Sequence, residues 1–175
     1  MKPLLAATAV ALSMADAAPA AEAELKITRT GTRPVVTAPE QNFTGQVKVE
    51  MLYTPVDEER ASAGTVSFSP GARTAWHSHP LGQTLVVTAG IGRVQRWGGP
   101  VEEIRVGDVV HIPAHVKHWH GAAADSAMTH IAITEALNGS AAQWMEHVSD
   151  AQHAVPPVPV TAVGLAREAD KAPQP

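Results

Sequence analysis

The stretch Gly71-Ala72-Arg73-Thr74-Ala75-Trp76-His77-Ser78-His79-Pro80-Leu81-Gly82-Gln83 decides how this chain is interpreted. Successive side chains of an extended strand point to opposite faces, so His77 and His79 point the same way. A second run downstream carries His118 and His120 at the same spacing. Two such pairs can converge on one ion, and neutral imidazole suits a divalent first-row metal. The sequence therefore predicts a metal centre.

Gln83 follows the short turn Pro80-Leu81-Gly82 and could add a hard amide oxygen as a further ligand. It could instead orient a water or the substrate, and the residues alone leave both roles open. A buried histidine is usually a hydrogen-bonded core residue. Three imidazoles at this spacing make that interpretation the weaker one.

The two runs resemble the paired motifs of the cupin family. The first motif is matched by Gly71, His77, His79, Gln83 and Gly90, and the second by Gly107, Pro113 and His118. Three positions depart from the usual pattern, since Gln83 replaces Glu, His115 replaces Gly and Ala122 replaces Asn. The resemblance implies a jelly-roll barrel whose metal ligands are His77, His79, Gln83 and His118.

A narrower resemblance covers about Gly45 to Asp150. The stretches GARTAWHSHPLGQTLVV, VEEIRVGDVV, KHWHGAAA, AMTHIAI and WMEHV are similar to the bacterial manganese-dependent cupin hydroxynitrile lyases. The resemblance implies manganese as the metal, with iron, zinc, nickel and cobalt left open. It also implies catalytic roles for His120 and His130. Thr134 departs from it, because these relatives carry Gln there.

The strand pattern predicts an all-β fold, a cupin jelly-roll barrel with a short C-terminal helix. Nine short runs rich in Val, Ile and Thr are separated by Gly or Pro turns: 46–53, 65–69, 74–78, 84–89, 92–96, 101–104, 109–112, 118–122 and 128–134. The spacing of Trp144, Met145 and Val148 predicts the helix over Ser140–Val148, packed outside the barrel.

Composition narrows the classes of protein. The chain has 175 residues, a formal charge of −4 and 45% hydrophobic residues, enough for one domain. Lysines and arginines are scattered, which argues against nucleic acid as a partner. The absence of cysteine excludes disulfides, thiolate ligands and a lipid-anchored start. We expect a small-molecule substrate.

The domain boundaries follow from local composition. Residues 1–20 have a lysine, a short apolar run and small residues before Ala20, and they predict a cleavable signal peptide, with a periplasmic or secreted product. The apolar run is too short to span a membrane. Residues 21–44 are interpreted as an N-terminal arm, 45–150 as the cupin domain and 151–175 as a Pro/Ala-rich disordered tail. By analogy with cupins, the arm favours a homo-oligomer, either a dimer or a tetramer.

His120 should face the same cavity as His118 and could act as a general base, with His130 as its partner. The alternatives are a hydrogen-bonding or ligand role for His120 and a barrel-wall role for His130. Trp76 and Trp119 have the opposite strand parity and should pack on the other face of the sheet. Arg73 is expected to pair with Glu102 or Glu103, and Asp108 is expected to lie in a turn. The remaining histidines are expected on the surface or in loops: His111, His115, His147 and His153.

Three functions are consistent with these residues. The first is a metal-dependent lyase that cleaves or forms cyanohydrins or a related hydroxy or carbonyl compound. The second is an iron-dependent dioxygenase. The third is a non-catalytic module that binds a small oxygen-bearing ligand. A neutral set of three His and one Gln leaves the charge of the metal uncompensated, which strengthens its Lewis acidity and favours the lyase.

Overall fold

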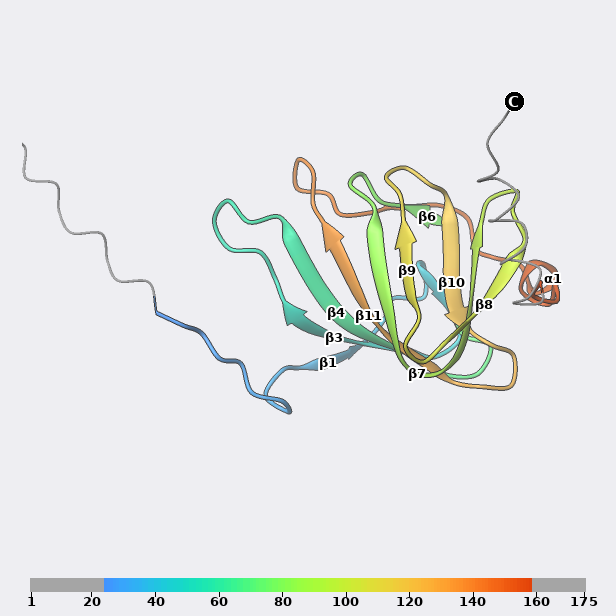
Figure 1. The fold of residues 1–175 in the computed structure, drawn as a ribbon, viewed down its shortest axis with the longest axis horizontal. Coiled ribbons are helices and arrows are strands. Elements are labelled where there is room, and N and C mark those ends of the chain that lie inside the picture. Colours follow the sequence, from blue (N-terminus) through green and yellow to red (C-terminus); the bar gives the residue numbers. More distant parts are fainter. Residues whose placement is uncertain (1–23, 159–175) are drawn as a thin grey trace, which may run out of the picture.

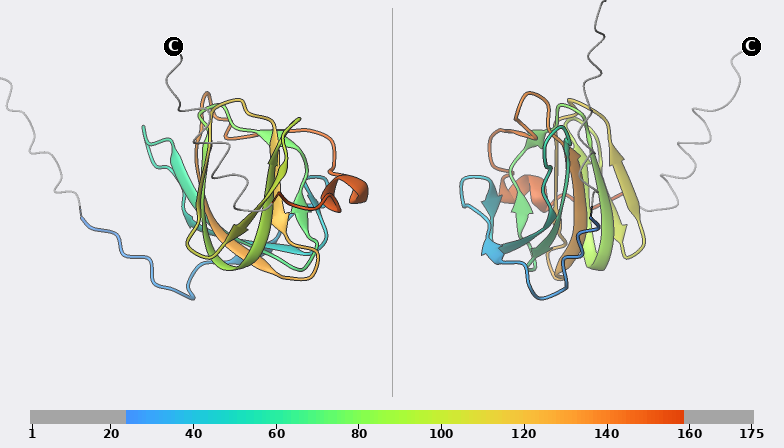
Figure 2. Two further views of the ribbon diagram at one scale, coloured as in Figure 1. Left: turned by 45° about the vertical axis from the view of Figure 1, so that its right-hand side comes forward. Right: turned by 90° about the vertical axis from the view of Figure 1, so that its left-hand side faces the viewer.

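Strands curl into a barrel that is open at one end (Figures 1 and 2). The computed structural model describes residues 24–158, so the predicted signal peptide lies outside the described part. The strands are β1 Val35–Thr37, β2 Phe43–Thr44, β3 Val47–Tyr53, β4 Ala61–Phe68, β5 Arg73–Thr74, β6 His77–Ser78, β7 Gln83–Arg96, β8 Val101–Arg105, β9 Val109–Ile112, β10 His118–Ala122, β11 Met128–Glu135 and β12 Gln143–Trp144. One helix, α1, spans Asp150–His153.

The named strands all pair antiparallel and form two curved layers. One layer has the order β1-β3-β4-β11-β7-β9, and the other joins β8, β7, β10, β5 and β2, with β6 pairing β10 and β12 pairing β6. The predicted all-β jelly roll is confirmed. The two runs predicted at 84–89 and 92–96 are one strand, β7, which belongs to both layers.

Gly90 is where β7 passes from one layer to the other. Its φ is +73°, and a Cβ there would lie 1.8 Å from the carbonyl oxygen of Ala127. Only glycine satisfies both conditions without moving the backbone. The register of β11 against β7 shifts at the same level, between Thr129 and His130.

The core lies on both faces of β10. The interior of the barrel contains the cluster Ala38, Val47, Val66, Phe68, Ala72, Val87, Ile104, Ala122 and Met128. A second cluster, Trp76, Val101, Trp119 and Val148, packs outside with Met145. Trp119 donates its indole N–H to Gln95 Oε1 at 2.8 Å. The two tryptophans therefore pack away from the histidines, as their strand parity predicts.

The predicted helix over Ser140–Val148 is wrong. Gln143–Trp144 is instead the strand β12, and the pairing continues where Met145 donates its N–H to Trp76 O and Trp76 donates its N–H to Glu146 O. Nine residues with only three large apolar side chains do not distinguish a helix from a strand. The segment forms a strand because the edge of β6 offers backbone hydrogen-bond partners to it. An isolated turn of helix would leave those backbone groups of β6 without these partners.

The helix begins one segment later. Ser149 caps α1 through a reciprocal capping box with Gln152. Residues 151–158 belonged to the tail predicted to be disordered, yet His153 is buried and Val158 donates its N–H to Val101 O at 2.9 Å. The remainder of that tail, 159–175, lies outside the described residues. No helix within 24–158 is long and apolar enough to cross a membrane.

Arg73 holds this C-terminal segment against the barrel. Its Nε and Nη2 donate to Val148 O at 3.1 and 2.9 Å, and Nη2 also pairs with Asp150 at 2.6 Å. The predicted pairing with Glu102 or Glu103 is wrong, because β5 lies beside β10 whereas those residues lie on β8. Arg73 is buried, so its bonds to Val148 O are shielded from water.

We expect Arg73→Met to lower the free energy of unfolding by about 2 kcal/mol, because a buried carbonyl loses its donor. Urea denaturation followed by circular dichroism measures this. Arg96 is exposed, and Arg96→Met is the matched control, with an expected change within about 0.5 kcal/mol. Equal midpoints for the two variants would contradict the anchoring role.

Candidate metal centre

Three histidines from two neighbouring strands meet inside the barrel. His77 lies on β6 and stands opposite His118 on β10, while His79 follows β6 directly. One nitrogen of each ring lies within 4.8 Å of the others. Imidazole bonds a metal at roughly 2.1 Å, so atoms up to about 4.2 Å apart can share an ion. A small rotation of the rings would suffice to bind one metal.

Backbone carbonyl groups orient all three rings. The Nδ1–H groups donate to Ala75 O for His77 at 3.0 Å, to Ala141 O for His79 at 2.6 Å, and to Val116 O for His118 at 2.8 Å. A neutral ring that donates from Nδ1 has its lone pair on Nε2. Three fixed Nε2 lone pairs are the donor set that a divalent metal requires.

Burial keeps these rings neutral. It lowers the pKa of His77 well below its usual value, with further lowering by His118 and His79. Burial also lowers the pKa of His79, and it lowers the pKa of His118 to about 4. Near neutral pH the rings therefore have free lone pairs rather than protons.

Gln83 lies beside this triad at the start of β7. Its Oε1 is 3.2 Å from His118 Nε2, which has a lone pair because Nδ1 is the protonated nitrogen. Two acceptors therefore face one another, and a cation between them would satisfy both. The turn before Gln83 depends on Gly82, whose φ is +84° and whose Cβ would meet Ile112 O at 2.7 Å. The donors thus fit a metal, with Gln83 placed to join them.

His120 and His130 form a second pair beside the triad. His120 Nδ1 lies 3.1 Å from His130 Nε2, and the ring centroid of His120 is 5.2 Å from that of His77. His120 Nε2 is buried and has no hydrogen-bond partner in the described part of the chain. Burial and His130 lower the pKa of His120, and burial lowers the pKa of His130 to about 4. The pair is neutral, and when His120 donates from Nδ1 to His130 Nε2, His120 Nε2 has a lone pair that can accept a proton from outside the pair.

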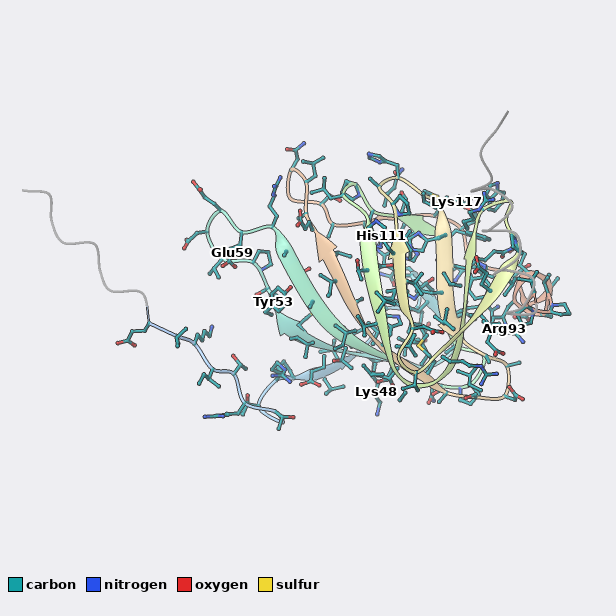
Figure 3. The ribbon with its side chains drawn as sticks, in the orientation of Figure 1. Lys48, Tyr53, Glu59, Arg93, His111 and Lys117 are labelled. Atoms are coloured by element: carbon teal, nitrogen blue, oxygen red, sulfur yellow. The ribbon has the colours of Figure 1, made fainter. Side chains whose placement is uncertain are left out.

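Acid should destabilise the fold partly through His130. Its pKa is about 4 when folded and 6.5 in an unperturbed state, so between these values the unfolded chain binds the extra proton. The contribution of His130 to the free energy of unfolding is fully present above pH 6.5. It falls as the pH decreases toward 4, with a slope of up to about 1.4 kcal/mol per pH unit. In chelator, His130→Leu should show a slope smaller by that amount. His111→Leu, which removes an exposed imidazole from β9 (Figure 3), is measured alongside as the control.

The remaining histidines differ from one another. His111, His115 and His147 are exposed, as predicted, but His153 is buried, and its Nε2 donates to Ala122 O at 3.0 Å. His115 has a φ of +64°, the left-handed region that explains why cupins usually have glycine at this position. Its N–H donates to His79 O at 2.8 Å, so the loop still supports the metal triad.

Sequence reasoning missed two features of the site. The Ala141 carbonyl that orients His79 comes from the segment predicted to be helical. The indole of Trp144 stacks on His77 with ring centroids 4.6 Å apart. No local signal in the sequence identifies either feature, since both depend on where β12 lies.

Thr134 stands opposite Gln83 in the β11–β7 pairing, with its hydroxyl 3.2 Å from that of Ser62.

Comparisons with known proteins agree with this geometry. Residues 64–134 match the sequence profile of the cupin domain. Over 129 residues the chain is 53% identical to the (R)-mandelonitrile lyase of Granulicella tundricola, a match that covers 74% of this chain and 98% of that protein.

Solved structures show the same architecture. A cupin-like protein from Thermotoga maritima superposes with a TM-score of 0.63 at 41% identity, covering 73% of this chain and 94% of that one. A cupin-2 domain from Rhodospirillum rubrum superposes with a TM-score of 0.57 at 19% identity, covering 73% and 82%. The second likeness shows the fold alone.

Proposed function

This chain belongs to the cupin family, and from that premise we propose that it is a metal-dependent lyase that cleaves and forms cyanohydrins. The observation that carries the proposal is the pairing of a neutral metal-ligand set with an adjacent buried histidine pair, in a chain 53% identical to an (R)-mandelonitrile lyase. The substrate class is a hydroxynitrile, with an aldehyde and hydrogen cyanide as products.

His77, His79, His118 and Gln83 would hold the metal. The metal would supply Lewis acidity toward the substrate oxygen. We propose manganese as the metal, because a site of three His and one Gln is typical of the manganese lyases that the sequence resembles. Elemental analysis of protein purified without chelator tests this directly. If another first-row metal is found at full occupancy, the assignment of manganese is wrong, whereas the assignment of the ligands stands.

His120 is placed to move the proton. Its Nε2 has no hydrogen-bond partner among residues 24–158 and can accept the hydroxyl proton of the substrate. As the O–H electron pair becomes the second bond of the carbonyl, the carbon–carbon bond breaks and its electron pair leaves with cyanide. The proton returns from the His120–His130 pair to cyanide, which gives hydrogen cyanide. Addition of cyanide to an aldehyde follows the reverse order.

Mandelonitrile cleavage by the metal-loaded full chain tests the proposal, with benzaldehyde measured by absorbance, in air and without oxygen. We expect equal rates in both, because the reaction consumes no oxidant. Oxygen uptake coupled to turnover would favour the dioxygenase. Binding of hydroxy compounds with no turnover of any cyanohydrin would favour the binding module.

We also propose that the chain forms a homo-oligomer. Leu25 and Ile27 are 96% and 67% exposed on a segment that extends away from the barrel (Figure 1), and Val36 is exposed on the edge strand β1. A groove of about 980 Å³, whose lining includes no histidine, lies between this segment and the β3–β4 hairpin that carries Tyr53 and Glu59 (Figure 3). Light scattering of the purified chain measures the mass.

Export is proposed on sequence grounds alone. The apolar run from Leu4 to Leu12 and the small residues before Ala20 have the composition of a cleavable signal. Expression of the full chain in a secreting host, followed by intact mass of the periplasmic fraction, measures whether the first residues are removed.

A further inference from the structure

Trp144 stands on the same face of the sheet as the metal ligands. It pairs directly with His77 in the antiparallel register of β12 and β6, and residues opposite one another in such a pair project to the same side. The two rings are stacked, with 4.6 Å between centroids and 28° between planes. The indole is therefore part of the interior wall next to the metal site.

Trp144 nevertheless remains 38% exposed, whereas Trp76 and Trp119, on the outer face, are almost fully buried. A side chain that projects inward and still meets solvent marks an opening of the barrel. Figure 1 shows the orange segment between β11 and α1 crossing this end of the molecule. His77 lies behind the indole and is buried.

Further aromatic rings continue from this opening into the barrel. The ring of Phe43 lies 5.5 Å from that of Trp144 and 6.3 Å from that of Phe68. Phe68 in turn lies 6.0 Å from His120, edge-on, and 5.5 Å from His130. A row of three rings thus connects solvent to the two histidines proposed to move the proton.

We propose that Trp144 forms the wall of the substrate site that contacts the organic substituent of the substrate and selects planar, aromatic groups over saturated groups of equal size. The inference rests on the proposed function for the identity of the substrate, and on the aromatic row for the preference. A flat ring can stack on the indole or meet its edge, whereas a puckered saturated ring gains only apolar contact.

The backbone holds the indole in place independently of the metal. Strand β12 is anchored to β6 by backbone pairing, and Glu146, two residues after Trp144, forms an ion pair with Lys117. Trp144 has no atom that could serve as a metal ligand. Its replacement should therefore alter substrate preference while the metal content stays the same.

The test compares mandelonitrile with its cyclohexyl analogue, which has nearly the same volume but no aromatic ring. In Trp144→Leu we expect the ratio of kcat/KM for the aryl over the cyclohexyl substrate to fall about two- to tenfold, mainly through KM. Trp144→Phe should keep most of the preference. Trp97→Leu is the matched control, because Trp97 is also exposed but lies at the end of β7 outside this row, and its ratio should match the wild type. Metal content is measured for every variant.

Binding of benzyl alcohol and of cyclohexylmethanol to the metal-loaded protein, measured by calorimetry, separates the two proposals. If no nitrile is cleaved but benzyl alcohol binds more tightly and Trp144→Leu removes that preference, the lyase proposal fails and the role of Trp144 stands. An unchanged aryl preference in Trp144→Leu with full metal content overturns the role of Trp144. A wild type without any aryl preference overturns it as well.

Discussion

Replacing His118 by Ala should remove metal and cyanohydrin cleavage together. His118 joins the triad from β10, and its Nε2 is the atom next to Gln83. Loss of an outer partner of a metal ligand costs about 10- to 100-fold in affinity, and loss of a ligand itself should cost more. Elemental analysis after dialysis should therefore show little metal, and no benzaldehyde should form from mandelonitrile. Gln83→Ala should lower occupancy less, because an amide oxygen binds metals more weakly than imidazole does.

His111→Ala is the control for this experiment, since it removes an exposed imidazole from β9 without touching the triad. It should retain wild-type metal content and rate. Full metal content in both His118→Ala and His77→Ala would sink the ligand assignment, and thermal unfolding of each variant would show whether the barrel had survived the change.

His120→Ala should have the opposite signature, with metal retained and the rate reduced about 10²- to 10⁴-fold, the usual contribution of positioned proton transfer. His120 is buried beside the triad, and no described residue forms a hydrogen bond with its Nε2. The comparison with His118→Ala separates a base from a ligand, because only the ligand variant loses metal. Metal analysis and the cleavage rate, measured on the same sample, give both quantities.

His130→Ala should cost less than His120→Ala, and the double variant should be scarcely slower than His120→Ala alone. The two rings share one hydrogen bond, so their contributions do not add. Wild-type cleavage by metal-loaded His120→Ala would remove this residue from the mechanism. Additive losses in the double variant would show that the histidines act separately.

The fold could be predicted from the sequence wherever runs rich in β-forming residues were bounded by glycine or proline turns. Strands β3, β9, β10 and β11 lie within one residue of the bounds that were predicted from β-forming residues and the turns between them. The segment around Trp144 could not be predicted in this way. Its few apolar residues fit two periods, and only the exposed edge of β6, supplied by residues nearly seventy positions earlier, selects the strand.

The sequence by itself predicted that His77 and His79 share one face and that His118 and His120 share one face, because successive side chains of a strand alternate, and the resemblance to the cupin motifs predicted that the two pairs meet. Only the tertiary structure decided what surrounds them. Curling of the sheet places His130 within 3.1 Å of His120, brings Ala141 O to His79 and lays Trp144 over His77. Contacts of this kind depend on strand register and on the path of the chain across the barrel end, and neither is encoded in the spacing of neighbouring residues.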